Sequence, residues 1–189
     1  MIVVEVRAHV SGDELLIGLD LPAPRATVVL NGSTAARDPA LAGVLAALAG
    51  AAIRERLTVV TGGTDAGIFS LFGAAMAEPT APLVGVTPRD RDGVPLEPNH
   101  THVVLVDGDT WGDETPVLLA LADALGRLAP SVAVICGGGA ITRLEAQGHL
   151  RAGRPLITVA GSGGVADELA EHAVAPAGLV DAVLEALGV

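Results

Sequence analysis

Residues 134–145 read Val-Ile-Cys-Gly-Gly-Gly-Ala-Ile-Thr-Arg-Leu-Glu, an apolar run that breaks into three glycines and continues as a helical pattern. A buried strand, a glycine turn and a helix in this order are typical of a phosphate-binding turn, because the free N–H groups at the start of the helix attract an anion. Glycines also let the backbone come close to a ligand. Arg143 lies in the first helical turn, where a cation opposes the helix dipole. A bound anion between them would explain its position.

The rest of the chain, from residue 26 onward, repeats this alternation. Short apolar runs alternate with alanine-rich helical segments, which is typical of parallel strands joined by helices. Strands are predicted at residues 27–30, 57–61, 83–87, 102–106, 131–136 and 156–160. Helices are predicted after Gly63, Gly139 and Gly163, over residues 177–187, and after the Asp38-Pro39 and Thr115-Pro116 pairs, in which a capping residue precedes proline. We therefore expect an α/β fold: a Rossmann-like, open, mainly parallel sheet with helices on both faces.

The first 24 residues follow a different pattern. Residues 2–20 alternate around Ser11-Gly12-Asp13, which predicts a β-hairpin, and Leu21-Pro22-Ala23-Pro24 ends it. A chain of 189 residues, half of them apolar, is long enough for one core and too short for two comfortable domains. We expect a single domain over residues 1–189, with a hairpin and linker at 1–24 and the α/β core at 25–189.

Composition and charge exclude several functions. Eleven basic residues, all arginine, stand against 22 acidic ones, giving a net charge of −11. Without basic patches, general nucleic-acid binding is disfavoured, and without lysine a P-loop lysine and a Schiff base are excluded. A small anion remains compatible, because a few arginines and helix N-termini can hold it. No apolar stretch approaches the ~20 residues of a membrane span and the N-terminus lacks a leader pattern, so we expect a cytoplasmic protein.

Four predicted strands end in glycine or small polar residues. Parallel strands bring their carboxyl ends to one edge of the sheet, where ligands bind at the reversal of strand order. We therefore expect one composite pocket there, contacted by residues of the segments 31–34, 62–67, 137–139 and 161–164, among them Gly32, Ser33, Gly62, Gly63, Gly161, Ser162 and Gly163. Around Ser162 the pattern indicates a nest of hydroxyl and N–H groups for an oxyanion. Neither Ser33 nor Ser162 lies in a G-x-S-x-G elbow, which argues against a serine hydrolase.

The order of these motifs resembles the SLOG superfamily, and more closely its LSDAT branch. That branch includes the cytosolic N-terminal domain of melastatin-type TRP channels and stand-alone prokaryotic relatives. The resemblance covers residues 27–175 and is most specific at Pro98-Asn99-His100. It implies a Rossmann-like fold that binds or senses a nucleotide or a nucleotide-derived molecule such as ADP-ribose. Carried over residue by residue, it places ligand contacts at Gly62, Gly63, Thr64, Asn99, His100, Gly138, Gly139, Thr142 and Arg143.

Residues 138–145 also resemble the G-G-x-G-T-x-x-E motif of LOG-type phosphoribohydrolases, which release the base from a nucleoside monophosphate. That resemblance implies a catalytic role for Glu145, as carboxylates have in glycosidic cleavage. Gly137 and Ile141 depart from the family's proline and second glycine, and the family's Arg-Lys pair has no counterpart between residues 123 and 130. Three hypotheses follow: a nucleotide sensor, a nucleotide hydrolase that uses Glu145, and a scaffold that self-associates. A homodimer or a higher homo-oligomer stays open as an alternative to a monomer.

Other polar residues leave a metal site as an alternative. His100 and His102 would face the same way on a strand, and the acidic residues at 107, 109, 113 and 114 follow them. These acids lack a defined ligand spacing, and Glu114 suits the beginning of a helix, so we expect no metal and no cofactor beyond the nucleotide ligand. Trp111 is interpreted either as a packing residue or as a platform on which a base stacks.

Overall fold

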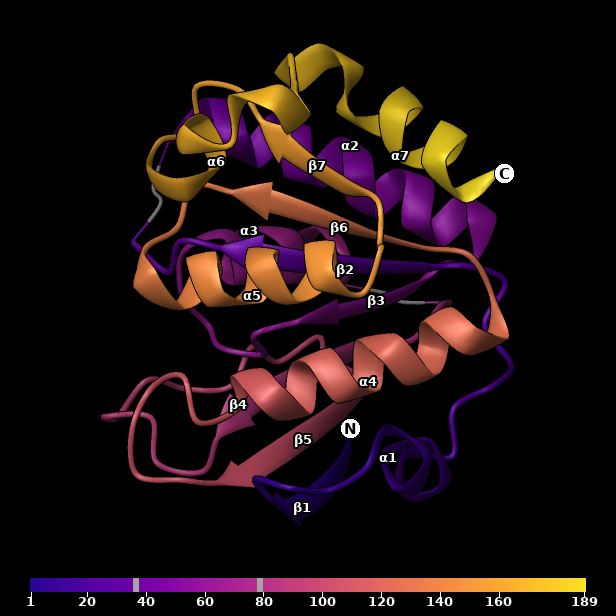
Figure 1. Ribbon diagram of the computed structural model, residues 1–189, viewed down its shortest axis with the longest axis vertical. Helices are drawn as coiled ribbons and strands as arrows, with labels where there is room; N and C mark the ends of the chain where they lie inside the picture. Colours follow the sequence, from indigo (N-terminus) through magenta and orange to yellow (C-terminus); the bar gives the residue numbers. More distant parts are fainter. Residues whose placement is uncertain (36–37, 78–79) are drawn as a thin grey trace.

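Eight parallel strands form one sheet at the centre of the computed structural model, which describes residues 1–35, 38–77 and 80–189 (Figure 1). Their order in the sheet is β1-β5-β4-β3-β2-β6-β7-β8. The bounds are β1 (Ile2–Arg7), β2 (Thr27–Gly32), β3 (Thr58–Thr61), β4 (Leu83–Pro88), β5 (His102–Asp107), β6 (Ser131–Cys136), β7 (Leu156–Val159) and β8 (Ala173–Val174). The predicted α/β class with an open, mainly parallel sheet is confirmed.

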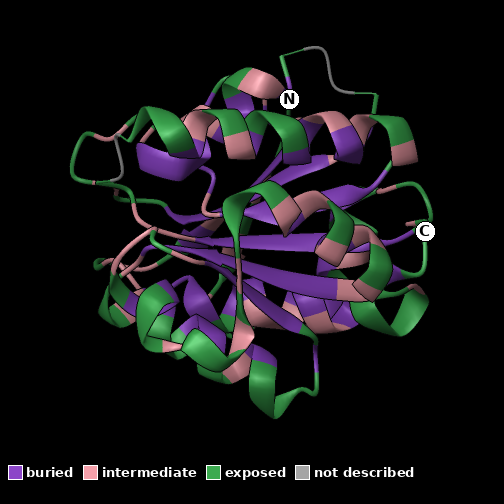
Figure 2. Cartoon of the chain, turned by 90° about the horizontal axis from the view of Figure 1, so that it is seen from above, coloured by how far each residue is buried: buried purple, intermediate pink, exposed green. Residues whose placement is uncertain are grey.

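Helices cover both faces of this sheet, as predicted. They are α1 (Gly12–Leu19), α2 (Pro39–Glu55), α3 (Gly67–Ala75), α4 (Thr115–Leu128), α5 (Ala140–Arg151), α6 (Gly164–Glu168) and α7 (Leu179–Leu187) within the described ranges. One core cluster joins α2, α3 and α7 to the sheet, and another joins α1 and α4 to the opposite face. Figure 2 shows the result, with buried strands enclosed between helices whose outer surfaces are exposed.

The Asp38-Pro39 and Thr115-Pro116 pairs both lie at the beginning of a helix. The Asp38 carboxylate accepts a hydrogen bond from Ala40 N at 2.8 Å, so Asp38 caps α2 and Pro39 occupies its first position. At α4 the capping position falls on Glu114, one residue before the predicted Thr115. The backbone of Glu114 is already helical, with φ −76° and ψ −19°, so Thr115 becomes the first residue of the helix.

The predicted N-terminal hairpin is wrong. Strand β1 lies at the edge of the sheet and pairs in parallel with β5, from Ile2 opposite His102 onward. Residues 12–19 form helix α1, because Ser11 and Glu14 make a capping box: Ser11 N donates to the Glu14 carboxylate at 3.0 Å, and Ser11 Oγ accepts from Glu14 N. The i, i+4 spacing of Leu15 and Leu19 then buries both side chains in the core cluster shared with α4.

The strand order reverses at β2. Strand β2 lies between β3 and β6, so the chain leaves it toward one side of the sheet and later returns on the other. A crevice therefore opens between the carboxyl ends of β2 and β6, where Gly32 pairs with Cys136. None of the helices in the described ranges is long and apolar enough to cross a membrane.

Candidate functional site

A cavity of about 560 Å³ lies at the crevice between β2 and β6. Its lining comes from the turns after β2, β3 and β6 and from the first turns of α3 and α5, with Val94, Trp111 and Glu114 closing it from loops on the other side. The lining residues are Gly32, Ser33, Thr34, Gly62, Thr64, Ala66, Phe69, Val94, Trp111, Glu114, Gly139, Ala140, Ile141, Thr142 and Glu145. Three of the four predicted strand ends thus meet at one cavity.

The glycine turn after β6 contacts both α6 and the cavity. Gly137 and Gly138 take positive φ, and their carbonyl oxygens accept hydrogen bonds from Ala166 N and Val165 N at 3.1 Å each, which fastens the turn to α6. Gly139 instead lines the cavity together with the first residues of α5. Within the described residues no side chain caps α5. Because Ala140, Ile141 and Thr142 line the cavity, the positive end of the α5 dipole lies at its wall.

The turn after β7 binds a carboxylate of its own chain. Gly161 N and Gly163 N donate to the two oxygens of Asp167 at 2.8 and 3.1 Å. Ser162 Oγ donates to Val159 O at 2.6 Å and accepts from Gly137 N at 2.9 Å. The predicted oxyanion nest is thus formed, but Asp167 occupies it, and the structure places these three residues outside the cavity lining.

Arg143 also has an anionic partner within the protein. Its guanidinium pairs with Glu168 at the end of α6, and both side chains are about half exposed. An anion beside the first turn of α5 was expected from the dipole argument, and Glu168 supplies it. Arg143 lies outside the lining residues.

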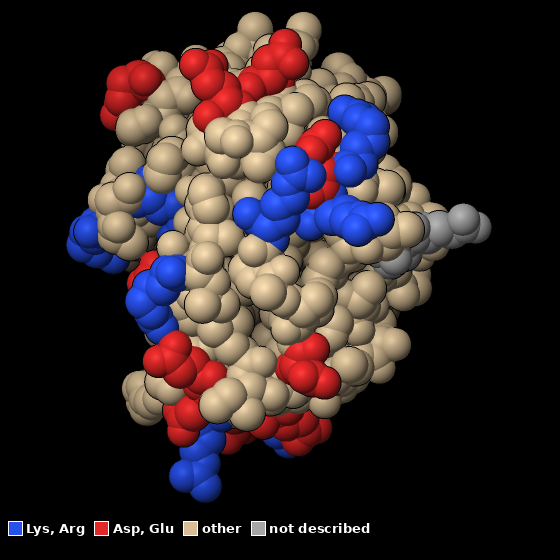
Figure 3. Space-filling view, turned by 90° about the vertical axis from the view of Figure 1, so that its right-hand side faces the viewer, with Lys and Arg blue, Asp and Glu red and all other residues tan. Residues whose placement is uncertain are grey.

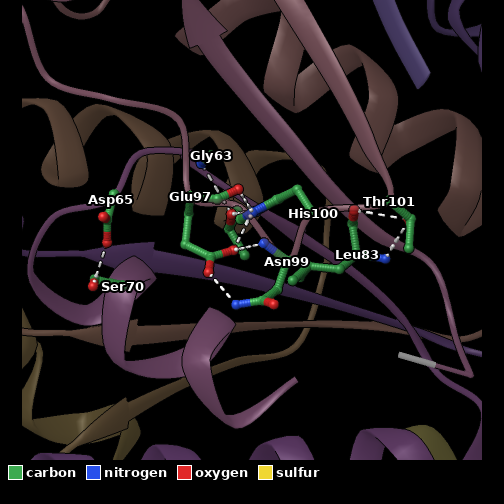
Figure 4. Close-up of polar contacts among 9 residues, drawn as sticks. Gly63, Asp65, Ser70, Leu83, Glu97, Asn99, His100 and Thr101 are labelled. Atoms are coloured by element: carbon green, nitrogen blue, oxygen red, sulfur yellow. Dashed lines mark hydrogen bonds and ion pairs between the residues drawn. The ribbon is translucent and has the colours of Figure 1, made fainter. Parts of the chain in front are cut away.

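Asn99 and His100 belong to a buried network beside the cavity (Figure 4). His100 Nε2 lies 2.8 Å from Thr61 Oγ1, and His100 Nδ1 lies 2.8 Å from Glu97 Oε2. Asn99 donates to the same carboxylate through its backbone N at 3.0 Å and its Nδ2 at 2.7 Å. Thr61, His100 and Glu97 are each at most 2% exposed. This arrangement is sealed from solvent and anchors the loop before β5 to β3.

The network sets the backbone at the cavity wall. Thr61 Oγ1 accepts a hydrogen bond from Gly63 N at 3.0 Å, and Glu97 N donates to Gly63 O at 3.1 Å. Gly63 takes a φ of +71°, and its α-carbon lies against the backbone of Gly85. Thr64, the next residue, faces the cavity. The Pro98-Asn99-His100 segment therefore shapes the site from behind. No three His, Cys, Asp or Glu side chains group as metal ligands in the described part of the chain.

Two buried carboxyl groups face the same cavity. Glu145 on α5 and Glu114 before α4 are each 7% exposed. Burial raises the pKa of Glu145 to about 8, the Glu114 carboxylate adds to the rise, and the Asn31 amide opposes it. Burial also raises the pKa of Glu114, against the opposing effect of backbone N–H groups such as that of Gly112. Burial and like charge thus both favour the protonated form of a carboxyl group at this place.

The chain matches the family described as "SLOG in TRPM, prokaryote" over residues 21–187. The chain belongs to this family. No curated protein shows significant similarity to it. Two solved structures have a similar fold. TM1055, a structural genomics target, is 24% identical, with a TM-score of 0.61 over 77% of this chain and 81% of that one. The molybdenum cofactor binding protein from the phototrophic bacterium Rippkaea orientalis is 14% identical, with a TM-score of 0.65 over 87% of this chain and 98% of that one.

Two residues of the cavity lining, Glu114 and Trp111, were not predicted as ligand contacts. The sequence pattern indicates a helix start or a metal site at Glu114, and either packing or base stacking at Trp111. Trp111 lines the cavity while its Nε1 donates to Asp92 Oδ2 at 2.8 Å, which joins it to the loop after β4. The local sequence around Glu114 is that of an ordinary helix start, so only the meeting of α4 and α5 reveals its burial beside Glu145.

The Glu145 carboxyl predicts a pH-dependent stability. Because its folded-state pKa of about 8 lies above the ordinary value of 4.5, its favourable contribution is fully present below pH 4.5 and is lost as the pH rises to about 8. In Glu145→Gln the amide has nearly the shape of the protonated carboxyl and stays uncharged at every pH. We expect the variant's free energy of unfolding, relative to the native sequence, to increase by about 4 kcal/mol between pH 4.5 and pH 9 in urea titrations. Glu185→Gln, at an exposed position on α7, is the control. A constant difference between the Glu145 variant and the native protein across this range would refute the assignment.

Proposed function

We propose that this SLOG domain binds a phosphate-bearing nucleotide, or a molecule derived from one, in the cavity between β2 and β6, and that its role is to sense this ligand. The observation that carries the proposal is the convergence of two helix N-termini without side-chain caps, those of α3 and α5, on one concave site. Their N–H groups favour an anion. A volume of about 560 Å³ falls within the range of ligand pockets.

An unpartnered hydroxyl supports a ligand at this place. Thr64 Oγ1 is buried and lines the cavity, yet it has no hydrogen-bond partner among the residues that the structure describes. Burying a hydroxyl without a partner costs free energy. Thr64 differs from the other buried, unpartnered threonines because it lines the cavity, where a ligand group that bonds to Oγ1 would recover that cost.

The cavity lining contains two chemically different sets of groups. The α3 and α5 N-termini, with Ser33 and Thr34, suit the phosphate. The second set is Glu114, Glu145 and Trp111. A phosphate there would meet carboxyl groups, whereas a sugar hydroxyl or a base can accept and donate hydrogen bonds and stack on the indole. We therefore place the phosphate at the helix ends and the uncharged part of the ligand near Glu145.

Thermal unfolding with a ligand panel tests this function. ADP-ribose, NAD and nucleoside monophosphates are compared with adenosine, which lacks the phosphate, and with the molybdenum cofactor that the Rippkaea orientalis protein binds. A ligand at a hundred times its Kd stabilises the native state by about 2.7 kcal/mol, which for a chain of this size raises Tm by about 5 to 10 °C.

The Thr64 hydroxyl offers a matched pair of variants. We expect Thr64→Val to weaken binding of the active ligand about fivefold to tenfold in calorimetric titrations, as loss of one hydrogen bond does. Thr27→Val removes another buried, unpartnered hydroxyl, at the far end of β2, and should leave affinity unchanged. Absence of any Tm increase with the whole panel would instead favour the scaffold hypothesis.

A second candidate function is hydrolysis of a nucleotide at its glycosidic bond. One observation favours it: Glu145 is a buried acid with a raised pKa beside a second carboxyl, the pairing that glycosidic cleavage uses. Incubation with nucleoside monophosphates, ADP-ribose and NAD, followed by chromatography, separates the two functions. Base release that disappears in Glu145→Gln would support the hydrolase; saturable binding without release would support the sensor.

A further inference from the structure

A buried polar chain crosses the layer between the sheet and α5 and ends beside the cavity. It begins at the amino-terminal edge of the sheet, the face seen in Figure 3, on which acidic and arginine side chains are mixed. There Arg154 donates to Asp123 Oδ1 at 2.7 Å and to Ser131 Oγ at 3.1 Å. Its Nη1 lies 2.5 Å from His149 Nδ1, and His149 Nε2 lies 2.9 Å from Asn31 Oδ1. His149 and Asn31 are at most 1% exposed.

The chemistry of these groups fixes the direction of every hydrogen bond in the chain. A guanidinium only donates, so His149 Nδ1 accepts and carries no proton. His149 is therefore neutral with its proton on Nε2, and this N–H donates to Asn31 Oδ1. Burial and the adjacent Arg154 agree with this, since they lower the pKa of His149 to about 3. A reversed Asn31 amide would set two donors against each other.

The fixed amide leaves one donor aimed elsewhere. With Oδ1 turned to His149, Asn31 Nδ2 points the other way, and it has no hydrogen-bond partner within the described residues. Glu145 lies one helical turn before His149 on the same face of α5, and the Asn31 amide opposes the rise in the pKa of Glu145. Asn31 immediately precedes Gly32, a cavity residue, at the end of β2. The unpartnered Asn31 amide and the buried Glu145 carboxyl therefore both lie next to the cavity.

We propose that Asn31 is a positioning residue, held in one orientation by His149 and Arg154, that donates to one oxygen of Glu145 and turns the protonated oxygen into the cavity. The floor of the cavity then offers the ligand an O–H donor. This inference rests on the proposed function and refines it, because the group that Glu145 recognises is an uncharged acceptor, such as a sugar oxygen or a ring nitrogen.

The tautomer of His149 is tested first, without any substitution. In the native, ligand-free protein with ¹⁵N-labelled histidine, we expect at pH 7 a protonated Nε2 and an unprotonated Nδ1 for His149. An imidazolium, or a proton on Nδ1, would overturn the proposal, because Asn31 would no longer be held with Nδ2 toward Glu145.

The second test measures the pKa of Glu145 from the ¹³C shift of its carboxyl carbon. We expect Asn31→Leu to raise this pKa by roughly one pH unit, since a hydrogen bond to the charged form is lost. Arg154→Met should act in the same direction, because His149 can then change tautomer and Asn31 can reverse. Thr27→Val, on the same strand, should leave it unchanged. A purely structural Asn31 would lower Tm without moving the pKa.

The outcomes are separable from those of the ligand test. If both Asn31→Leu and Arg154→Met leave the pKa of Glu145 at its native value, the positioning role is wrong even where nucleotides bind. If the pKa moves but the whole ligand panel fails to raise Tm, the positioning role stands and the proposed function fails. Should Asn31→Leu not fold, Arg154→Met and the native tautomer still decide the matter.

Discussion

Replacing Glu97 with alanine is expected to lower the free energy of unfolding by about 3 kcal/mol or more. The Glu97 carboxylate accepts hydrogen bonds from Asn99 N and Asn99 Nδ2 and contacts His100 Nδ1 at 2.8 Å, in a site that is 2% exposed. Removing it leaves the two part-buried Asn99 donors without this acceptor, and the buried His100 Nδ1 keeps only the Glu97 backbone oxygen at 3.3 Å. Each unsatisfied buried group costs about 1 to 3 kcal/mol. Urea unfolding at pH 7 measures the loss.

An exposed glutamate provides the matched control for this substitution. Glu5 pairs with Arg89 at 2.8 Å, and both side chains are more than half exposed. Exposed pairs contribute about 0 to 1 kcal/mol, so Glu5→Ala should change little. Equal losses for Glu97→Ala and Glu5→Ala would show that the network does not anchor the loop before β5.

Replacing Gly32 with alanine is expected to destabilise the native fold by about 3 kcal/mol or more and to abolish ligand binding. A Cβ atom at this position would collide with the carbonyl oxygen of Cys136 and lie 2.8 Å from Ile68 Cδ1. The residue also takes a φ of +153°, which side chains disfavour. Relief requires β2 and β6 to separate at the floor of the cavity.

The Gly43→Ala substitution on α2 tests whether the destabilisation is specific to the close contact between β2 and β6. A Cβ there meets nothing within 4 Å, and the residue is exposed in the interior of a helix. Gly43→Ala should therefore stabilise the protein by about 0.5 to 1 kcal/mol, as helix propensity predicts. Circular dichroism melts of both variants give the comparison, and a Gly32→Ala melt that matches the native one would contradict the expected collision.

Local patterns were enough to predict most of the sheet. The predicted strand at 131–136 matches β6 at both ends, and Asp38-Pro39 marks the start of α2 because capping is a local interaction. The N-terminal hairpin failed for a local reason too. Alternation in residues 2–7 does indicate a strand, but the Ser11 and Glu14 capping box begins a helix where alternation alone predicts a second strand.

The glycine turns of the candidate site could be predicted, because each turn is encoded by adjacent residues. The charged partners of these turns could not, because they come from other segments of the chain. Asp167 and Glu168 on the short helix α6 supply the anions for the Gly161–Gly163 turn and for Arg143. Nothing in the spacing of these residues shows that α6 folds back onto the turn after β6. The burial of Glu114 beside Glu145 likewise depends on how α4 and α5 lie over the sheet.

The reversal of strand order at β2 also bears on how the protein folds. Thr27 of β2 pairs with Ser131 of β6, so this seam joins residues from distant parts of the chain, whereas β2 and β3 are joined by a single helix. Closing so long a loop is slow relative to local contacts. The cavity forms only when that closure is complete. A ligand of this cavity can bind only after the two halves of the sheet have joined, so it binds the native state and not partly folded states.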